Sequence, residues 1–250
     1  MRIIQLTDLH IGREGENSHG VDVRSNFISL VKKIPSLDAD EIIITGDLCL
    51  DKGDSLIYDW IVDQLEPLNL PVRVISGNHD DSSQLAKSFE MKGLLQRKEL
   101  YYLRTETPLP IFYLDTAKGR VSKRQLKWLE EEVLKCIGPI IIFMHHPPLL
   151  AGVPHMDKKY ALKNRAELQS ILLMHSDPIH IYCGHYHVEK LISYHNLVVH
   201  ITPSSYFQID QFRDDFAVDH YRIGFRVIDL TSDQVNSTVV YTDGMSLMGE

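Results

Sequence analysis

Five short segments of the sequence contain aspartate, asparagine and histidine, side chains that bind first-row transition metals in proteins. In chain order the segments are Asp8-Leu9-His10, Gly46-Asp47, Gly77-Asn78-His79-Asp80, His145-His146 and Gly184-His185-Tyr186-His187. Six of the thirteen histidines lie in these segments, whereas chance would spread them along the whole chain. The clustering predicts that the five segments form one metal site.

Each segment alone has a plainer interpretation. Asp8 and His10 alone would be typical of a loop with a helix cap, and Asp47 after Gly46 would be typical of a turn. A single histidine at a strand end, such as His145, is more often structural. The occurrence of all five segments in one chain favours metal binding over five independent structural roles.

The set contains no cysteine, which favours a catalytic centre with two metal ions over a closed structural zinc site. A carboxylate such as Asp47 can bridge two ions, and Asn78 can supply a neutral oxygen. Two ions about 3.5–4 Å apart promote in-line displacement at phosphorus, because they generate a hydroxide nucleophile and neutralise the phosphoryl oxygens. The set therefore predicts phosphoester hydrolysis with two divalent or mixed-valence ions of iron, manganese, zinc or cobalt.

Each of the five segments follows an apolar run rich in isoleucine and valine. The runs span residues 3–6, 41–45, 72–76, 140–144 and 179–183. Helix-period segments alternate with them, including 122–135, which opens with a capping-box pattern, and 164–174. This alternation predicts an α/β fold. Because ligands bind outside the carboxyl ends of strands in α/β sheets, the five segments should converge on one crevice.

Two stretches depart from the alternation. Residues 101–114 contain paired strand-like runs, and residues 191–241 indicate several antiparallel strands without a strong helix. A mixed sheet, or two packed sheets with outer helices, fits this pattern better than a purely parallel sheet. The chain has no repeat, low-complexity tract or linker, so residues 1–250 are predicted to form a single domain.

Composition limits the partners that the chain can bind. It has 26 Lys and Arg against 34 Asp and Glu, a formal net charge of −8, which argues against nucleic acid and anionic membranes as partners. Small phosphorylated ligands remain compatible with this charge, because metal cations can reverse the local field. The three cysteines are too few for a disulfide framework, and the N-terminal residues show no signal-peptide pattern, so a cytoplasmic protein is predicted.

In their order along the chain, the five segments resemble the calcineurin-like metallophosphoesterase superfamily, from the first strand to the fifth. The resemblance implies one metal ion held by Asp8, His10, Asp47 and His187 and a second held by Asp47, Asn78, His145 and His185, with Asp47 bridging. It also implies that His79 contacts the phosphate and protonates the leaving oxygen while Asp80 orients the imidazole. His79 and Asp80 are therefore the expected catalytic residues, and Asn78, His79 and His187 the expected substrate contacts.

Further motifs are similar to bacterial class III cyclic-nucleotide phosphodiesterases and their glycerophosphodiesterase relatives. They comprise His145-His146-Pro147-Pro148, Ala151-Gly152, Met156-Asp157, Leu162-X-Asn164, Glu167-Leu168, Thr202-Pro203-Ser204, Phe207-Gln208 and Gly224-Phe225-Arg226. This resemblance implies a four-layer α/β/β/α sandwich of two mixed sheets flanked by helices, with the active site along one edge. It also implies hydrolysis of 3′,5′-cyclic AMP to 5′-AMP by a metal-bridging hydroxide, and it suggests a homodimer.

The nucleoside would have to be held by residues 155–164 and by Tyr206 or Phe207, although packing within loops explains these side chains equally well. Glycerophosphodiesterase or broad phosphodiesterase activity is an alternative that uses the same predicted metal ligands. A non-enzymatic scaffold on the same fold is disfavoured, because such scaffolds typically lose ligands that this chain keeps. A nuclease is disfavoured by the acidic charge and the lack of a basic stripe.

Overall fold

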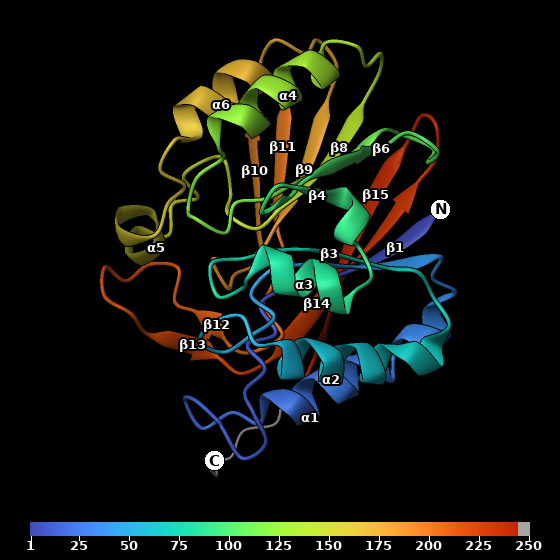
Figure 1. Ribbon diagram of the computed structural model, residues 1–250. Coiled ribbons are helices and arrows are strands. Elements are labelled where there is room, and N and C mark those ends of the chain that lie inside the picture. The colour runs from blue at the N-terminus through green and yellow to red at the C-terminus, as the bar shows by residue number, and fades with distance from the viewer. Residues whose placement is uncertain (245–250) are drawn as a thin grey trace.

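The computed structural model describes residues 1–244 and contains two mixed β-sheets packed against each other, with helices outside them (Figure 1). The last six residues of the predicted domain, 245–250, lie outside the described residues. The predicted α/β/β/α sandwich is confirmed.

The five-stranded sheet has the strand order β15-β14-β1-β2-β3. Its strands are β1 (Arg2–Leu6), β2 (Glu41–Thr45), β3 (Val72–Ile75), β14 (Ile223–Leu230) and β15 (Val235–Thr242). β1, β2 and β3 run parallel, whereas β14 is antiparallel to both β1 and β15. Every residue of β2 is buried, which explains why this strand is an almost continuous apolar run rather than an alternating one.

The six-stranded sheet has the order β10-β11-β9-β8-β7-β6. Its strands are β6 (Tyr102–Arg104), β7 (Ile111–Leu114), β8 (Ile140–Met144), β9 (Ile179–Cys183), β10 (Lys190–Tyr194) and β11 (Leu197–Ile201). The two edge strands are antiparallel to their neighbours, and the inner pairs are parallel. Rings of Tyr113, Phe143 and Tyr182 stack across β7, β8 and β9 at centroid distances of 5.7 and 5.4 Å, which favours this register.

Helices cover the outer faces of both sheets. The described helices are α1 (Val23–Val31), α2 (Ser55–Leu65), α3 (Ser82–Ser88), α4 (Lys123–Val133), α5 (Pro154–Lys159) and α6 (Arg165–Leu172), with 3₁₀ turns at Ile34–Leu37, Glu66–Leu68 and Lys92–Leu94. Figure 1 shows α1 and α2 on the side of the five-stranded sheet and α4 and α6 on the side of the six-stranded sheet. Among residues 1–244, no helix has the length and apolar character needed to cross a membrane.

Two short strand pairs complete the fold. β4 (Leu95–Gln96) pairs with β5 (Glu99–Leu100), and β12 (Gln208–Ile209) pairs with β13 (Val218–His220). The hairpin of β12 and β13 lies beside α5 in Figure 1, and an ion pair of 2.6 Å between Lys158 and Asp214 joins the two elements. His155 Nδ1 lies 3.3 Å from the Asp214 carbonyl oxygen, which gives a second contact between α5 and the hairpin.

The predicted strands and helices agree closely with the structure. The five apolar runs are confirmed as β1, β2, β3, β8 and β9, each within one residue of the predicted bounds. α4 begins as the capping-box pattern predicts, because the hydroxyl of Ser122 accepts a hydrogen bond of 3.2 Å from the Gln125 N–H. α6 begins after Asn164, but the Asn164 amide bonds to both backbone groups of Val121, at 3.0 and 2.9 Å, instead of capping its own helix.

The predicted antiparallel strands of residues 191–241 are present, but they do not form one sheet. β10 and β11 extend the six-stranded sheet, where β11 runs parallel to β9, whereas β14 and β15 belong to the five-stranded sheet. A buried network joins the two sheets: the Thr202 hydroxyl donates to Gln5 Oε1 at 2.6 Å and accepts from Arg226 Nε at 2.9 Å. The sequence could not assign these strands to one sheet or the other, because the apolar residues of a strand do not specify which strand it pairs with.

Gly184, directly after β9, allows the ends of the two sheets to approach each other closely. A Cβ atom at this position would overlap the Thr7 hydroxyl and lie within 2.5 Å of Asp8 Oδ2. The Gly184 N–H also donates a hydrogen bond of 3.1 Å to the His145 carbonyl oxygen. A side chain at position 184 would therefore separate β9 from β1.

We expect Gly184→Ala to lower the free energy of unfolding by about 1–3 kcal/mol, because the added methyl group overpacks a site whose neighbours cannot retreat. Gly93→Ala is a matched control, since a Cβ at position 93 would have no atom within 4 Å. Urea denaturation of both variants measures the difference. Equal stability of the two variants would show that the sheets are not in close contact at Gly184.

Candidate metal centre

The five predicted segments meet at one place, as expected, although their strands belong to different sheets. Asp8, His10, Asp47 and the 77–80 segment follow β1, β2 and β3, whereas His145, His185 and His187 follow β8 and β9. Three groups have ligand atoms within 4.8 Å of one another: Asp8, His10 and His187; His10, Asp47 and His79; and Asp47, His145 and His185. The centre therefore lies where the carboxyl ends of both sheets come together.

Asp47 and His10 connect these groups. His145 Nε2 is 3.1 Å from Asp47 Oδ2, and His10 Nε2 is 3.9 Å from the same oxygen. On the other side, His10 Nε2 is 3.1 Å from His187 Nε2, which is 3.4 Å from Asp8 Oδ1. These spacings allow two adjacent ions to share Asp47 as a ligand.

Backbone carbonyl groups orient three of the imidazoles. His145 Nδ1 lies 2.8 Å from the Thr45 oxygen, His187 Nδ1 lies 3.1 Å from the Phe207 oxygen, and His185 Nε2 lies 3.0 Å from the Tyr160 oxygen. Because a carbonyl oxygen only accepts, the nitrogen that faces it carries a proton, and the other nitrogen is the one that can bind a metal ion. This arrangement is typical of metal-binding histidines.

His145 provides a direct test of whether the residues fit a metal ion. Its Nε2 atom is buried and has no directed hydrogen-bond partner among residues 1–244, although Asp47 Oδ2 lies close by. This nitrogen and the Asp47 carboxylate face each other in a buried place, an arrangement in which a metal cation can take the position of the shared proton. The donor set, two carboxylates and several imidazoles without a thiolate, suits zinc, iron, manganese or cobalt.

Five of the predicted ligands have a left-handed backbone conformation. The φ angles of Asp8, His10, Asp47, His185 and His187 lie between +47° and +69°. In a strand, residues two apart face the same side at a spacing of about 7 Å. The left-handed conformation bends the chain between them. It brings Asp8 and His10, and likewise His185 and His187, to the same centre.

The carboxylates of Asp8 and Asp47 are buried and remain ionised. Burial alone would raise the pKa of Asp8, but the imidazoles of His187 and His145 outweigh it and lower this pKa to about 2. Burial is likewise outweighed at Asp47, where His145 and His10 hold the carboxyl pKa well below its usual value. Both groups are therefore available as anionic ligands throughout the physiological pH range.

Burial lowers the pKa of His10, His145 and His185, and the charges around each imidazole add to this effect or outweigh it. Burial and the neighbouring His187 lower the pKa of His10 to about 3, and burial and His145 lower that of His185 to about 4. At His145 burial acts in the same direction, but Asp47 and Asp8 outweigh it and raise the pKa to about 9. His10 and His185 are therefore neutral near pH 7, the form in which histidine binds metals.

Asn78 and His79 lie at the open side of the centre. Asn78 is exposed and lines the same cavity as His10, Asp47 and His185. The backbone N–H of His79 donates a hydrogen bond of 2.8 Å to Asp47 Oδ1, and its ring lies 5.0 Å from the ring of His10. Both side chains can therefore reach a ligand bound at the centre.

Asp80 has a different place from the one that the sequence implied. Its carboxylate accepts hydrogen bonds from the N–H groups of Leu48, Cys49 and Gly77, at 2.9–3.3 Å, and from the Tyr58 hydroxyl at 3.1 Å. His79 Nδ1, in contrast, is buried without a hydrogen-bond partner among the described residues. Asp80 therefore joins the loops after β2 and β3 and does not orient the His79 imidazole, because the tight turn at Gly77 directs its carboxylate to those N–H groups.

A cavity of about 370 Å³ opens above the centre and has an aromatic side. Four rings, which we call the aromatic wall, line it: His19, Tyr206, Phe207 and Phe216. Their centroids are 4.2 Å apart for Tyr206 and Phe207, 5.2 Å for His19 and Phe207, and 5.9 Å for Phe207 and Phe216. The wall contacts the predicted ligands, because Tyr206 lies 5.2 Å from the His10 ring and Phe207 lies 5.2 Å from the His187 ring.

Several of these cavity residues were predicted, and others were missed. Tyr206, Phe207 and, from residues 155–164, His155, Met156 and Tyr160 do line the cavity. The sequence analysis did not single out His19 or Phe216, and Phe216 reaches the cavity from the hairpin of β12 and β13. Neither residue lies in a periodic pattern, so the sequence carried no signal for their position.

The motif around Asp157 supports the framework of the site. The Asp157 carboxylate accepts hydrogen bonds from the N–H groups of residues 151–153, at 2.8–3.1 Å, and from the Tyr186 hydroxyl at 2.9 Å. Tyr186 lies between His185 and His187 in the chain. Asp157 therefore links α5 to the loop that carries two predicted ligands.

Comparison with known proteins finds similarity to phosphoesterases. The family model for calcineurin-like phosphoesterases matches residues 1–189. A probable cyclic nucleotide phosphodiesterase of Fibrobacter succinogenes is 34% identical, with 97% of this chain and 94% of the relative covered. A 3′,5′-cyclic adenosine monophosphate phosphodiesterase of Escherichia coli K12 is 26% identical, with 96% and 89% covered. The crystal structure of a dimetal phosphatase from Danio rerio shares the fold, with a TM-score of 0.71, 13% identity and 98% of both chains covered.

The adjacent histidines 145 and 146 provide a matched pair of variants. His146 Nδ1 lies 2.9 Å from the Thr116 hydroxyl, and His146 belongs to none of the three ligand groups. We expect His145→Ala to lower the metal content from about two ions per chain to about one, and His146→Ala to leave it near two. Elemental analysis of the purified proteins, with circular dichroism as a folding check, measures the outcome. Equal metal content in both variants would contradict the position of His145 in the centre.

Proposed function

The chain belongs to the calcineurin-like phosphoesterase family, and on this basis we propose that it is a dinuclear-metal phosphodiesterase that hydrolyses 3′,5′-cyclic AMP to 5′-AMP. The observation that supports this proposal best is the joint burial of Asp8 and Asp47 among imidazoles that converge from two sheets. An aromatic cavity next to this cluster supports a nucleotide as the substrate.

Seven residues would hold the ions. One ion would be bound by Asp8, His10, Asp47 and His187, and the other by Asp47, Asn78, His145 and His185. Metal ions in these positions supply Lewis acidity towards the phosphoryl oxygens and an activated water as nucleophile. Iron, manganese, zinc and cobalt are all compatible with this donor set.

His79 is proposed as the general acid. Its backbone N–H is held by Asp47 at 2.8 Å, and its side chain lines the cavity in which the substrate would bind. From this position the imidazole can protonate the departing 3′-oxygen of the ribose, a step that poor leaving groups require. Asn78 and His187, which line the same cavity, are the proposed further contacts to the phosphate.

The aromatic wall is proposed as the binding site of the nucleobase. Tyr206 and Phe207 lie directly beside the rings of His10 and His187, so a base stacked on them would lie next to its phosphate at the metal ligands. Stacking on aromatic side chains is a common way in which proteins hold bases, because every base has a π face. A glycerol-based diester would leave this wall without a stacking partner.

The substrate preference can be measured directly. We expect the manganese-loaded protein to hydrolyse 3′,5′-cyclic AMP with a kcat/KM at least about tenfold above that for glycerophosphoethanolamine, because only the nucleotide uses the aromatic wall. Chromatography should identify 5′-AMP as the product. Good turnover of bis-p-nitrophenyl phosphate with little turnover of cyclic AMP would support phosphodiesterase activity but would exclude cyclic AMP as the substrate.

The role of His79 predicts a dependence on the leaving group. We expect His79→Ala to lower kcat for cyclic AMP by about 10²–10⁴, because its ribose oxygen needs a proton, and to affect bis-p-nitrophenyl phosphate much less. Metal content should be unchanged, which elemental analysis checks. An equal loss on both substrates would contradict the proposed acid role.

A further inference from the structure

A second cavity, of about 350 Å³, adjoins the candidate metal centre. It shares Asn78, Tyr160 and His185 with the cavity described above, so the two are continuous at the predicted ligands. Three lysines line it: Lys118 from the loop after β7, Lys159 at the end of α5, and Lys163 just before α6. We call it the lysine cavity.

The lysine cavity is cationic in a chain that is acidic overall. None of its lining residues is Asp or Glu. All three lysines are exposed, and within residues 1–244 none of their ammonium groups forms an ion pair, whereas the neighbouring Lys158 pairs with Asp214 at 2.6 Å. Unneutralised cations around one hollow repel each other and create a field that attracts an anion.

The backbone around this cavity is held in place before any ligand binds. The Lys163 N–H donates a hydrogen bond of 2.9 Å to the Gly119 carbonyl oxygen, which joins the two segments that carry Lys118 and Lys163. The Asn164 amide bonds to both backbone groups of Val121, and the Thr116 hydroxyl bonds to His146. The lysines therefore extend from fixed positions, which reduces the entropy lost on binding.

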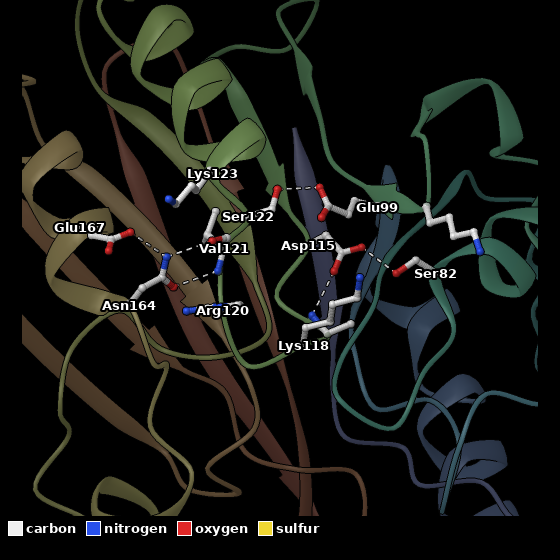
Figure 2. Close-up of a pocket in the computed structure, with 12 residues that line it drawn as sticks. Ser82, Glu99, Asp115, Lys118, Arg120, Val121, Ser122, Lys123, Asn164 and Glu167 are labelled. Carbon is white, nitrogen blue, oxygen red and sulfur yellow. Dashed lines mark hydrogen bonds between the residues drawn. The ribbon is translucent and has the colours of Figure 1, made fainter.

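The next cavity along the surface, of about 360 Å³, differs in charge (Figure 2). It shares Ala117 and Lys118 with the lysine cavity, but Glu99, Asp115 and Glu167 lie among its basic residues. Figure 2 shows the Glu99 carboxylate at the Ser122 hydroxyl, 2.7 Å away, and the Asp115 carboxylate at the Ser82 hydroxyl, 2.6 Å away. Of these two neighbouring cavities, only the lysine cavity has charged lining residues that are all cationic.

We propose that the lysine cavity binds a second phosphate group of the substrate, so that the protein also hydrolyses short linear dinucleotides that carry a 5′-terminal phosphate. This inference rests on the proposed function, and it extends the substrate class from cyclic nucleotides to phosphorylated dinucleotides. The aromatic wall would hold the nucleoside that keeps the attacked phosphate. The three lysines would hold the terminal phosphate of the leaving nucleotide.

The reaction is the one proposed for cyclic AMP. In the dinucleotide pApA, the oxygen of one water molecule forms a bond to the internal phosphorus, and the bond from phosphorus to the 3′-oxygen breaks. The 3′-oxygen leaves with a proton as a hydroxyl group, and the products are two molecules of 5′-AMP. No oxidant, reductant or further co-reactant is needed.

Hydrolysis of pApA and of ApA, which lacks the terminal phosphate, tests the proposal in manganese-loaded protein. We expect a kcat/KM ratio of pApA to ApA of about ten or more, since three exposed ammonium contacts together are worth about one factor of ten. In the triple variant K118Q/K159Q/K163Q the ratio should fall to near one. The ratio within one protein cancels any general effect of the substitutions on the metal centre.

The matched control is K32Q/K33Q/K92Q, which removes the same charge from three exposed lysines that line neither cavity. This variant should keep the ratio of the unsubstituted protein. Calorimetric titration of metal-free protein with pApA and with ApA should give the same preference in Kd, and it provides a readout that does not depend on turnover.

The outcomes separate the two proposals. A ratio near one in the unsubstituted protein, or a ratio that the triple variant leaves unchanged, would overturn the lysine cavity as a phosphate site. Hydrolysis of cyclic AMP without a preference for pApA would therefore reject this inference and retain the proposed function. Failure to hydrolyse cyclic AMP, both dinucleotides and bis-p-nitrophenyl phosphate with metal bound would reject the proposed function itself.

Discussion

The burial of two carboxylates, Asp8 and Asp47, where the sheets meet is the constraint on which the rest of the centre depends. Burial disfavours both negative charges, and the charge of Asp47 disfavours that of Asp8 further. The fold compensates with imidazoles and with backbone N–H groups: His185 donates to Asp8 at 2.9 Å, and His79 donates to Asp47 at 2.8 Å. Cations bound between the two carboxylates would complete the neutralisation.

The left-handed residues show how the backbone meets this constraint. Each costs about 1 kcal/mol relative to an ordinary conformation, so five of them at one place are retained only because neighbouring contacts hold them. The Asp8 N–H donates to the Gly46 carbonyl oxygen and the His10 N–H to the Asp47 carbonyl oxygen, each at 3.0 Å. The loops after β1 and β2 thus hold each other in the conformation that directs their side chains inward.

The strands and the convergence of the ligands could be predicted because the strands are buried on both faces and are therefore continuous apolar runs. The division of these strands between two sheets could not be predicted, because the hydrophobicity of a strand does not specify its neighbour in a sheet. Asp80 follows His79 in the chain, yet its carboxylate bonds to N–H groups of another loop, a contact that depends on tertiary structure. The same holds for Phe216, Lys118 and Lys163, which lie in loops, and for Lys159 at the end of α5, because no periodic pattern places them beside the centre.

The pairing of β1 with β14 also determines when the centre can form during synthesis of the chain. β1 lies between β2 and β14, so its sheet is incomplete until residues 223–230 have been made. His10 meets His187 across 177 positions of sequence, a long-range contact that is slow to form. A partly synthesised chain thus carries its first ligands only on unfinished loops, and high-affinity metal capture becomes a late event that marks the docking of the two sheets.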